Sequence, residues 1–142
     1  MSGMIYSALA GILIGLQSIF NARVGEKVGL WGANVLIHGV GFLLALIIFF
    51  SLRQGDFSRI NEINRLYLLG STFGVMIVFS AMKGLLLLGP VTSISIVMVA
   101  QLMVAVIAEG FGLFETAKMS LNPMKIVGIS MMLLGIFLFR SK

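Results

Sequence analysis

Long apolar runs, separated by short polar stretches, follow one another along the whole chain. A helix that crosses about 30 Å of hydrocarbon needs about 20 mostly apolar residues, because each residue advances the helix by about 1.5 Å. Five segments reach or approach this length, and we expect them to be membrane-spanning helices. They are residues 4–22, 32–52, 66–88, 91–114 and 125–140. The last is the shortest, so its ends must snorkel or the bilayer must thin around it.

Polar stretches and prolines set the ends of these helices. Residues 23–31 form a short interfacial turn, which predicts that the first two helices are antiparallel neighbours. Residues 53–65 are polar and predict a connection in water. Gly89 is followed by a proline that cannot continue a helix, so we expect the third helix to end there. Asn122, also followed by proline, predicts the cap and first turn of the last helix.

The composition excludes a soluble domain. Hydrophobic residues make up 59% of the 142 residues and charged residues 11%, and the mean hydropathy is +1.11; soluble domains have roughly 45–50% apolar and about 25% charged residues. We therefore expect an all-α membrane protein in which residues 1–142 form a single transmembrane domain. The net charge of +5 does not indicate a nucleic-acid partner, because most basic residues flank apolar runs and contact lipid headgroups.

The basic residues are divided equally between the two sides of the membrane. Five fall on one side and five on the other, once the expected helices alternate in direction. The first set is Arg53, Arg59, Arg65, Lys118 and Lys125, and the second is Arg23, Lys27, Lys83, Arg140 and Lys142. Orientation normally follows an excess of Lys and Arg on the cytoplasmic side.

This equality leaves little electrostatic preference for either orientation. The chain is therefore expected to insert both ways and to pair as an antiparallel homodimer, unless the order of insertion or a similar effect decides between the orientations. Two oppositely inserted copies would form the inverted repeat that many secondary transporters use, with a binding site near the middle of the membrane.

Four polar residues of the first two helices are candidates for one polar cluster. Gln17 and Asn21 lie one turn apart on one helix face, and Asn34 and His38 repeat this spacing in the second helix. Amides are poorly accommodated in lipid, so these faces should meet protein or a water-filled cavity. Two interpretations stay open for the cluster: hydrogen bonds that only hold the helices together, or contact with a solute. His38 is the natural proton carrier, although a single histidine often only donates to a backbone carbonyl.

The fourth helix carries two further candidates. Gln101 lies near its middle, and Glu109, eight residues later, is the acid within an expected span. An acid at this depth is costly unless it faces water or a partner, which favours a function in transport or coupling. An interfacial position, about one turn from the helix end, is the alternative for Glu109.

Small residues indicate helix packing rather than chemistry. Gly11 and Gly15 form one GxxxG pair and Gly70 and Gly74 another, a spacing that lets helix backbones approach closely in lipid. The chain has no cysteine, and its methionines show no metal-binding spacing, so no metal site and no cofactor are expected. No nucleophile with its base and no pair of carboxylates can be assembled, so the sequence does not indicate an enzyme.

Several of these segments resemble one known family. GLQSIFNARVG, HGVGFLL, LGSTFG, LGPVTSISIVMVAQLMVAVIAEGFGLF and GISMMLLGIFLF are similar to the YdcZ-type family of small bacterial inner-membrane proteins, within the drug/metabolite transporter superfamily. The resemblance implies a multi-pass inner-membrane protein of five helices. It also implies that two such halves, from one gene or from a paired homologue, equal a ten-helix transporter. Gln101 and Glu109 stand where the family tends to carry a glutamine and an acid.

The combined prediction is a secondary transporter that exports a small polar or amphipathic solute, acts as a dimer and is driven by protons. Gln17, Asn21 and Gln101 would line the site, and Glu109 or His38 would take up the proton. The alternative is a non-transporting subunit that scaffolds or regulates another membrane complex.

Overall fold

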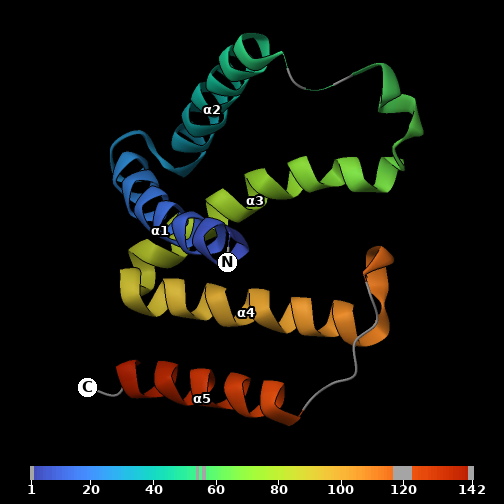
Figure 1. Ribbon diagram of the computed structural model, residues 1–142. Coiled ribbons are helices and arrows are strands. Elements are labelled where there is room, and N and C mark those ends of the chain that lie inside the picture. Colours follow the sequence, from blue (N-terminus) through green and yellow to red (C-terminus); the bar gives the residue numbers. More distant parts are fainter. Residues whose placement is uncertain (1, 54, 56, 117–122, 141–142) are drawn as a thin grey trace. The chain divides into compact units, whose positions relative to one another are not determined.

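The computed structural model describes residues 2–53, 55, 57–116 and 123–140, and over these residues it contains helices and no strands (Figure 1). The elements are α1 (Ser2–Val28), α2 (Leu30–Leu52), the 3-10 helix η1 (Phe57–Glu62), α3 (Arg65–Leu88), α4 (Pro90–Phe111), the 3-10 helix η2 (Leu113–Glu115) and α5 (Pro123–Arg140). The expected all-helical fold is thereby confirmed.

Four helices, α1 to α4, are long and apolar enough to cross a membrane. The described apolar part of α5, Val127–Leu138, is shorter, as expected for the last segment. The polar connection between α2 and α3 contains η1, whose Arg59 and Glu62 form an exposed ion pair at 2.7 Å. Asn64 then accepts a hydrogen bond from the backbone of Leu66 at 3.0 Å and caps the start of α3.

The helix α1 is longer than the apolar pattern predicts, because nothing in the polar stretch breaks it. Its 27 residues span about 40 Å, which exceeds the roughly 30 Å thickness of the hydrocarbon. In its last turns, Arg23 and Glu26 form an ion pair at 3.0 Å, one turn apart on the same helix. The interfacial turn is therefore reduced from the expected residues 23–31 to the single residue Gly29.

Single glycines join α1 to α2 and α3 to α4. Gly29 has φ 78° and ψ 156°, and Gly89 has φ 77° and ψ 164°. A side chain is strained at such positive φ, so glycine is required at both joints. The carbonyl of each glycine accepts the first hydrogen bond of the next helix, from Ala33 at 2.9 Å and from Ser93 at 3.1 Å. The expected end of the third helix before Gly89 is confirmed.

The chain divides into two compact units, residues 1–86 and 87–142, which are described separately. In unit 1, α1 packs on α2, and the buried residues of its helices lie near one end. We call this group the closed corner: Ala22, Gly25, Ala33, Asn34, Met82 and Leu85. A Cβ on Gly25 would lie 3.0 Å from Leu30 Cδ2 and 3.5 Å from Met82 Sδ. The absence of a side chain at this glycine therefore permits the close packing.

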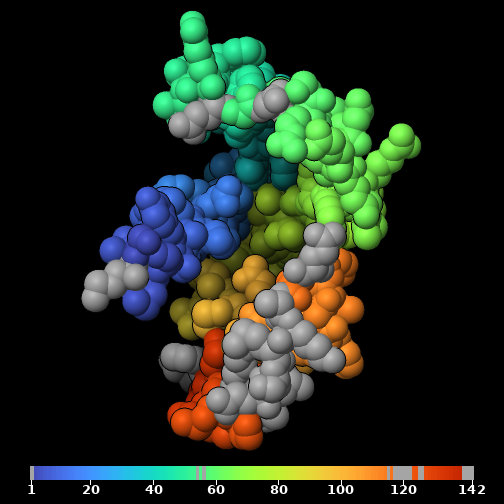
Figure 2. Space-filling view, turned by 45° about the vertical axis from the view of Figure 1, so that its right-hand side comes forward, coloured from blue at the N-terminus to red at the C-terminus, as the bar shows by residue number. Residues whose placement is uncertain are grey.

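Away from the closed corner, the helices of unit 1 are exposed. The start of α1 and the end of α2 stand apart in both views (Figures 1 and 2), and large apolar side chains such as Ile12, Phe42 and Phe73 are more than half exposed. Trp31 and Phe79 stack near the corner, with ring centroids 4.4 Å apart. In a bilayer, acyl chains or further helices cover such apolar side chains.

In unit 2, α4 packs on α5. The helix α4 ends at Phe111, three residues before the expected boundary, because Gly112 adopts a left-handed conformation with φ 67°. Phe114 is also left-handed, with φ 55°. Thr116 Oγ1 lies within hydrogen-bond distance of the carbonyls of Ala108, at 3.0 Å, and Leu113, at 2.7 Å. The backbone thus folds back onto the end of α4. α5 begins at Pro123 as expected, whereas the predicted cap Asn122 lies outside the described residues.

Candidate functional site

Asn34 is the most deeply buried of the predicted site residues. Only 2% of its surface is exposed, and its Nδ2 donates a hydrogen bond to the backbone carbonyl of Val75 in α3 at 2.8 Å. This bond joins α2 to α3 across 41 residues of sequence. The other amide atom, Oδ1, is buried and has no hydrogen-bond partner among the described residues. Such an orphaned acceptor costs about 1–3 kcal/mol and calls for an explanation.

His38 lies one turn beyond Asn34 and is half-buried. Its Nδ1 is 3.0 Å from the backbone carbonyl of Asn34. A carbonyl oxygen only accepts, so Nδ1 carries the hydrogen and donates it, and Nε2 of the neutral ring is an acceptor. On the α3 side, a Cβ built on Gly74 would lie 3.6 Å from Nε2. Asn34 and His38 therefore lie against successive residues of α3, Val75 and Gly74. We call these four residues the α2–α3 polar contact.

The two predicted site residues of α1 are less enclosed. Gln17 is exposed and Asn21 is half-buried, and no hydrogen bond within the described residues joins either side chain to the α2–α3 polar contact. The structure thus brings Asn34 and His38 together against α3, and leaves Gln17 exposed.

The predicted packing glycines also differ from one another. Gly74 faces the ring of His38, whereas a Cβ on Gly11, Gly15 or Gly70 would meet no atom within 4 Å. At the second GxxxG pair, close packing within the described residues is therefore limited to Gly74.

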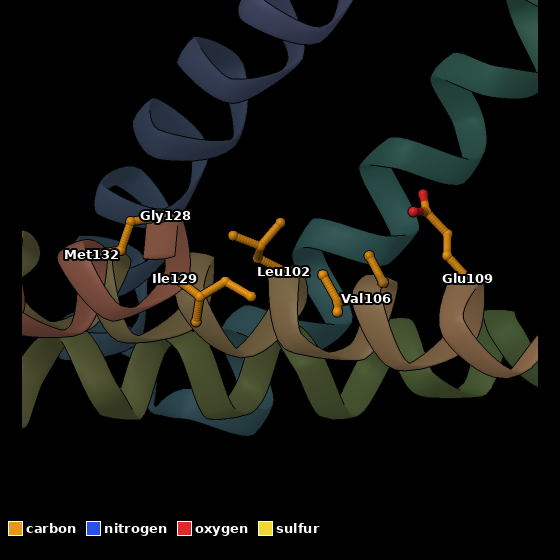
Figure 3. Close-up of a pocket in the computed structure, with 7 residues that line it drawn as sticks. Leu102, Val106, Glu109, Gly128, Ile129 and Met132 are labelled. Atoms are coloured by element: carbon orange, nitrogen blue, oxygen red, sulfur yellow. The ribbon is translucent and has the colours of Figure 1, made fainter. Parts of the chain in front are cut away.

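Unit 2 contains an open groove between α4 and α5 with a volume of about 590 Å³ (Figure 3). Six apolar residues and one acid line it: Leu102, Ala105, Val106 and Glu109 from α4, and Gly128, Ile129 and Met132 from α5. Figure 3 shows Glu109 at the end of the row that Leu102 and Val106 form along α4. We call this feature the α4–α5 groove.

Glu109 is half-buried, and Gln101 is exposed on α4 outside the groove lining. Gln101 and Glu109 therefore lie on different faces of α4. This follows from helix geometry, because eight residues do not complete a whole number of helical turns. Spacing alone could have found the α4 wall, because Leu102, Val106 and Glu109 recur at steps of three and four. The α5 wall, with Gly128 and Ile129, carries no polar signal and was missed.

A metal centre is not formed in the described part of the chain, where no group of three His, Cys, Asp or Glu residues comes together. The predicted site residues thus offer single hydrogen-bonding groups, and among them only Glu109 and His38 are titratable.

Comparison with known proteins decides the family. Residues 2–138 match the family model described as "Putative inner membrane exporter, YdcZ". The chain belongs to the YdcZ family. No curated protein and no solved structure matches the chain.

Membership in the YdcZ family, together with the apolar helices, makes this a multi-pass protein of the inner membrane and a membrane transporter. The resemblance found in the sequence motifs is thereby confirmed. The match covers all five α-helices except the last residues of α5. Both the α2–α3 polar contact and the α4–α5 groove therefore lie inside the family region.

Proposed function

We propose that this chain is one half of a proton-coupled secondary transporter, which exports a small polar or amphipathic solute. The observation that carries the proposal is the position of Glu109: a carboxyl group within a membrane-spanning helix, half-buried at one end of the α4–α5 groove. An ionisable group at membrane depth is expensive and is kept where it binds a solute or a proton.

The second half of the transporter is an antiparallel copy of the same chain or a paired homologue. The equal division of basic residues supports the homodimer, since neither orientation is favoured. The exposed amides of Gln17 and Gln101 support it as well, because a polar side chain within a span needs a protein or water neighbour. These amides with Asn21 line the solute pathway between the copies.

Transport by purified protein in liposomes tests the proposal. A panel of small polar and amphipathic solutes is screened with and without a pH gradient. We expect gradient-driven movement of at least one solute, slowed at least about tenfold in Glu109→Gln, which corresponds to about 1.4 kcal/mol. Glu26→Gln is the matched control, because Glu26 lies in the exposed ion pair with Arg23 and should transport normally. Equal rates with and without the gradient, together with normal transport by Glu109→Gln, would exclude proton coupling.

Topology and solvent access test the dimer and the alternative role. A reporter fused to each terminus should report both sides of the membrane, and one fixed side for either fusion would rule out dual insertion. The chain lacks cysteine, so single cysteines at positions 17, 21 and 101 can be probed with aqueous thiol reagents. We expect labelling at all three. Protection of all three in a protein that moves no solute would instead indicate a non-transporting subunit.

A further inference from the structure

The connection between α2 and α3 carries an apolar face that is not evident from its polar sequence. Phe57, Ile60 and Ile63 follow one another at steps of three residues, and side chains three apart lie one above the other in a 3-10 helix. η1 is such a helix from Phe57 to Glu62. The backbone N–H of Ile63 donates to the carbonyl of Ile60 at 3.3 Å, so the same winding continues to Ile63. These three side chains therefore share one side of η1, which we call the apolar face.

The other two sides of η1 are polar. Arg59 and Glu62, also three residues apart, form the exposed ion pair at 2.7 Å, and Ser58 and Asn61 share the remaining side. Neither the period of an α-helix nor the alternation of a strand would group the residues in this way. The 3-10 winding therefore makes an amphipathic helix out of a segment whose composition is polar.

Within the described part of the chain, the apolar face is left open. Phe57 is 68% exposed, Ile60 48% and Ile63 44%. A hollow of about 480 Å³ runs beside this face, and the ion pair and the first turn of α3 also border it. Its lining consists of Phe57, Arg59, Ile60, Glu62, Ile63 and Leu68. An occupant of the hollow would therefore contact both apolar and charged side chains.

The apolar face continues the apolar surfaces of two membrane-spanning helices. The ring of Phe57 lies against that of Phe49 in the last turn of α2, with centroids 5.0 Å apart, and Leu68 carries the apolar lining onto α3. Both helices are long and apolar enough to cross a membrane, so the segment that joins their ends lies where acyl chains meet headgroups. Residues 53–65 contain three arginines and two acids, and this positive excess is complementary to lipid phosphates.

We infer that η1 binds the bilayer surface, with its apolar face and Leu68 against the acyl chains of phospholipids and its polar sides toward the headgroups and water. Amphipathic helices of this kind bury their apolar side chains about 5–10 Å into the boundary between headgroups and acyl chains. The connection is then a lipid-binding surface, rather than the connection in water that its polar sequence predicts. This role is separate from solute transport and does not depend on it.

The depth of single side chains in the bilayer tests the inference. The chain lacks cysteine, so a nitroxide label can be attached to one introduced cysteine at a time, in nanodiscs of phosphatidylcholine and phosphatidylglycerol. Its relaxation is measured with oxygen, which concentrates among acyl chains, and with a water-soluble nickel complex. Ile60→Cys and Asn61→Cys are the matched pair, because they are adjacent in sequence and lie on different sides of η1.

We expect oxygen to relax the label severalfold more effectively than nickel at position 60, and the reverse at position 61. Phe57→Cys and Ile63→Cys should behave like Ile60→Cys, and Ser58→Cys like Asn61→Cys, so that the period of three does not rest on one variant. The ion pair of Arg59 and Glu62 is left intact in all five variants.

Two other results would overturn the inference, and each identifies a different occupant. Strong relaxation by nickel at positions 57, 60 and 63 would mean that water covers the apolar face. Weak relaxation by both reagents at these positions would mean that protein covers it, such as a second copy of the chain. Because no solute is moved in this experiment, a failure of the transporter proposal would leave its outcome unchanged.

Discussion

The closed corner of unit 1 and the α4–α5 groove of unit 2 differ in how tightly their helices pack. In lipid, the hydrophobic effect does not press helices together, so the side chains at each contact decide how closely they approach. At the corner, Gly25 and Ala33 let backbones approach until Met82 has no exposed surface. The groove also has a small residue on its wall, Gly128, but a Cβ built on Gly128 would meet no atom within 4 Å. Small residues therefore close one contact and leave the other open, and the acid Glu109 lies in the open one.

The largest effect on stability is expected when a large side chain is inserted at the corner. Gly25→Leu should lower the free energy of unfolding by about 2–3 kcal/mol, because the new side chain must displace Leu30 and Met82. The single tryptophan, stacked on Phe79 in unit 1, reports unfolding by its fluorescence in detergent micelles. The control Gly15→Leu, whose Cβ meets no atom within 4 Å, should unfold like the wild type. Equal losses in both variants would contradict the close packing at Gly25.

A smaller effect is expected when a buried side chain is shortened. Met82→Ala should cost about 1–2 kcal/mol, which is less than in a soluble core, because lipid is as apolar as the protein interior and only the packing around the cavity is lost. Met132→Ala, which enlarges the already open groove, is the matched control and should change stability by less than about 0.5 kcal/mol. Unfolding of Met82→Ala is followed by the same fluorescence assay. Unfolding of Met82→Ala and of Met132→Ala is compared by the loss of α-helical circular dichroism. A larger loss for Met132→Ala would show that the groove is closed in the membrane.

The smallest effect on stability should come from filling the groove. Gly128→Leu adds a side chain where no atom lies within 4 Å, so the free energy of unfolding should change by less than about 0.5 kcal/mol. Transport in liposomes should nevertheless fall severalfold, because the added side chain occupies part of the groove that Glu109 also lines. Gly3→Leu, in the first turns of α1 and equally open, should alter neither property. Normal transport by Gly128→Leu would remove the groove from the solute pathway.

Local patterns were enough to predict much of the fold. The apolar runs predicted the helices, and the pair Gly89 and Pro90 predicted the end of α3, because proline and positive φ act on the backbone at their own position. Residues 23–28 were expected to lie outside a helix, since polarity marks the membrane boundary. Polarity does not break a helix, however, and α1 continues to Val28, where Gly29 ends it.

The candidate site was predictable only in part. The sequence placed Asn34 and His38 on one helix face, and that periodicity is local. It did not reveal that α3 supplies the partner Val75, because any backbone carbonyl can accept and only the crossing of two helices selects one. Gln17 and Asn21 were expected in the same cluster, yet α1 and α2 diverge from the turn at Gly29, and the helix direction there decides which side chains meet.

The sequence by itself determined the class of this protein: a lipid-embedded, all-helical chain of the YdcZ family. These properties depend on composition and spacing, which need no knowledge of distant contacts. The tertiary structure alone decided that Asn34 is buried with an orphaned oxygen and that α5 provides one wall of the groove beside Glu109. Both depend on which helices pack together, and apolar faces of similar composition do not encode their partners in any local pattern.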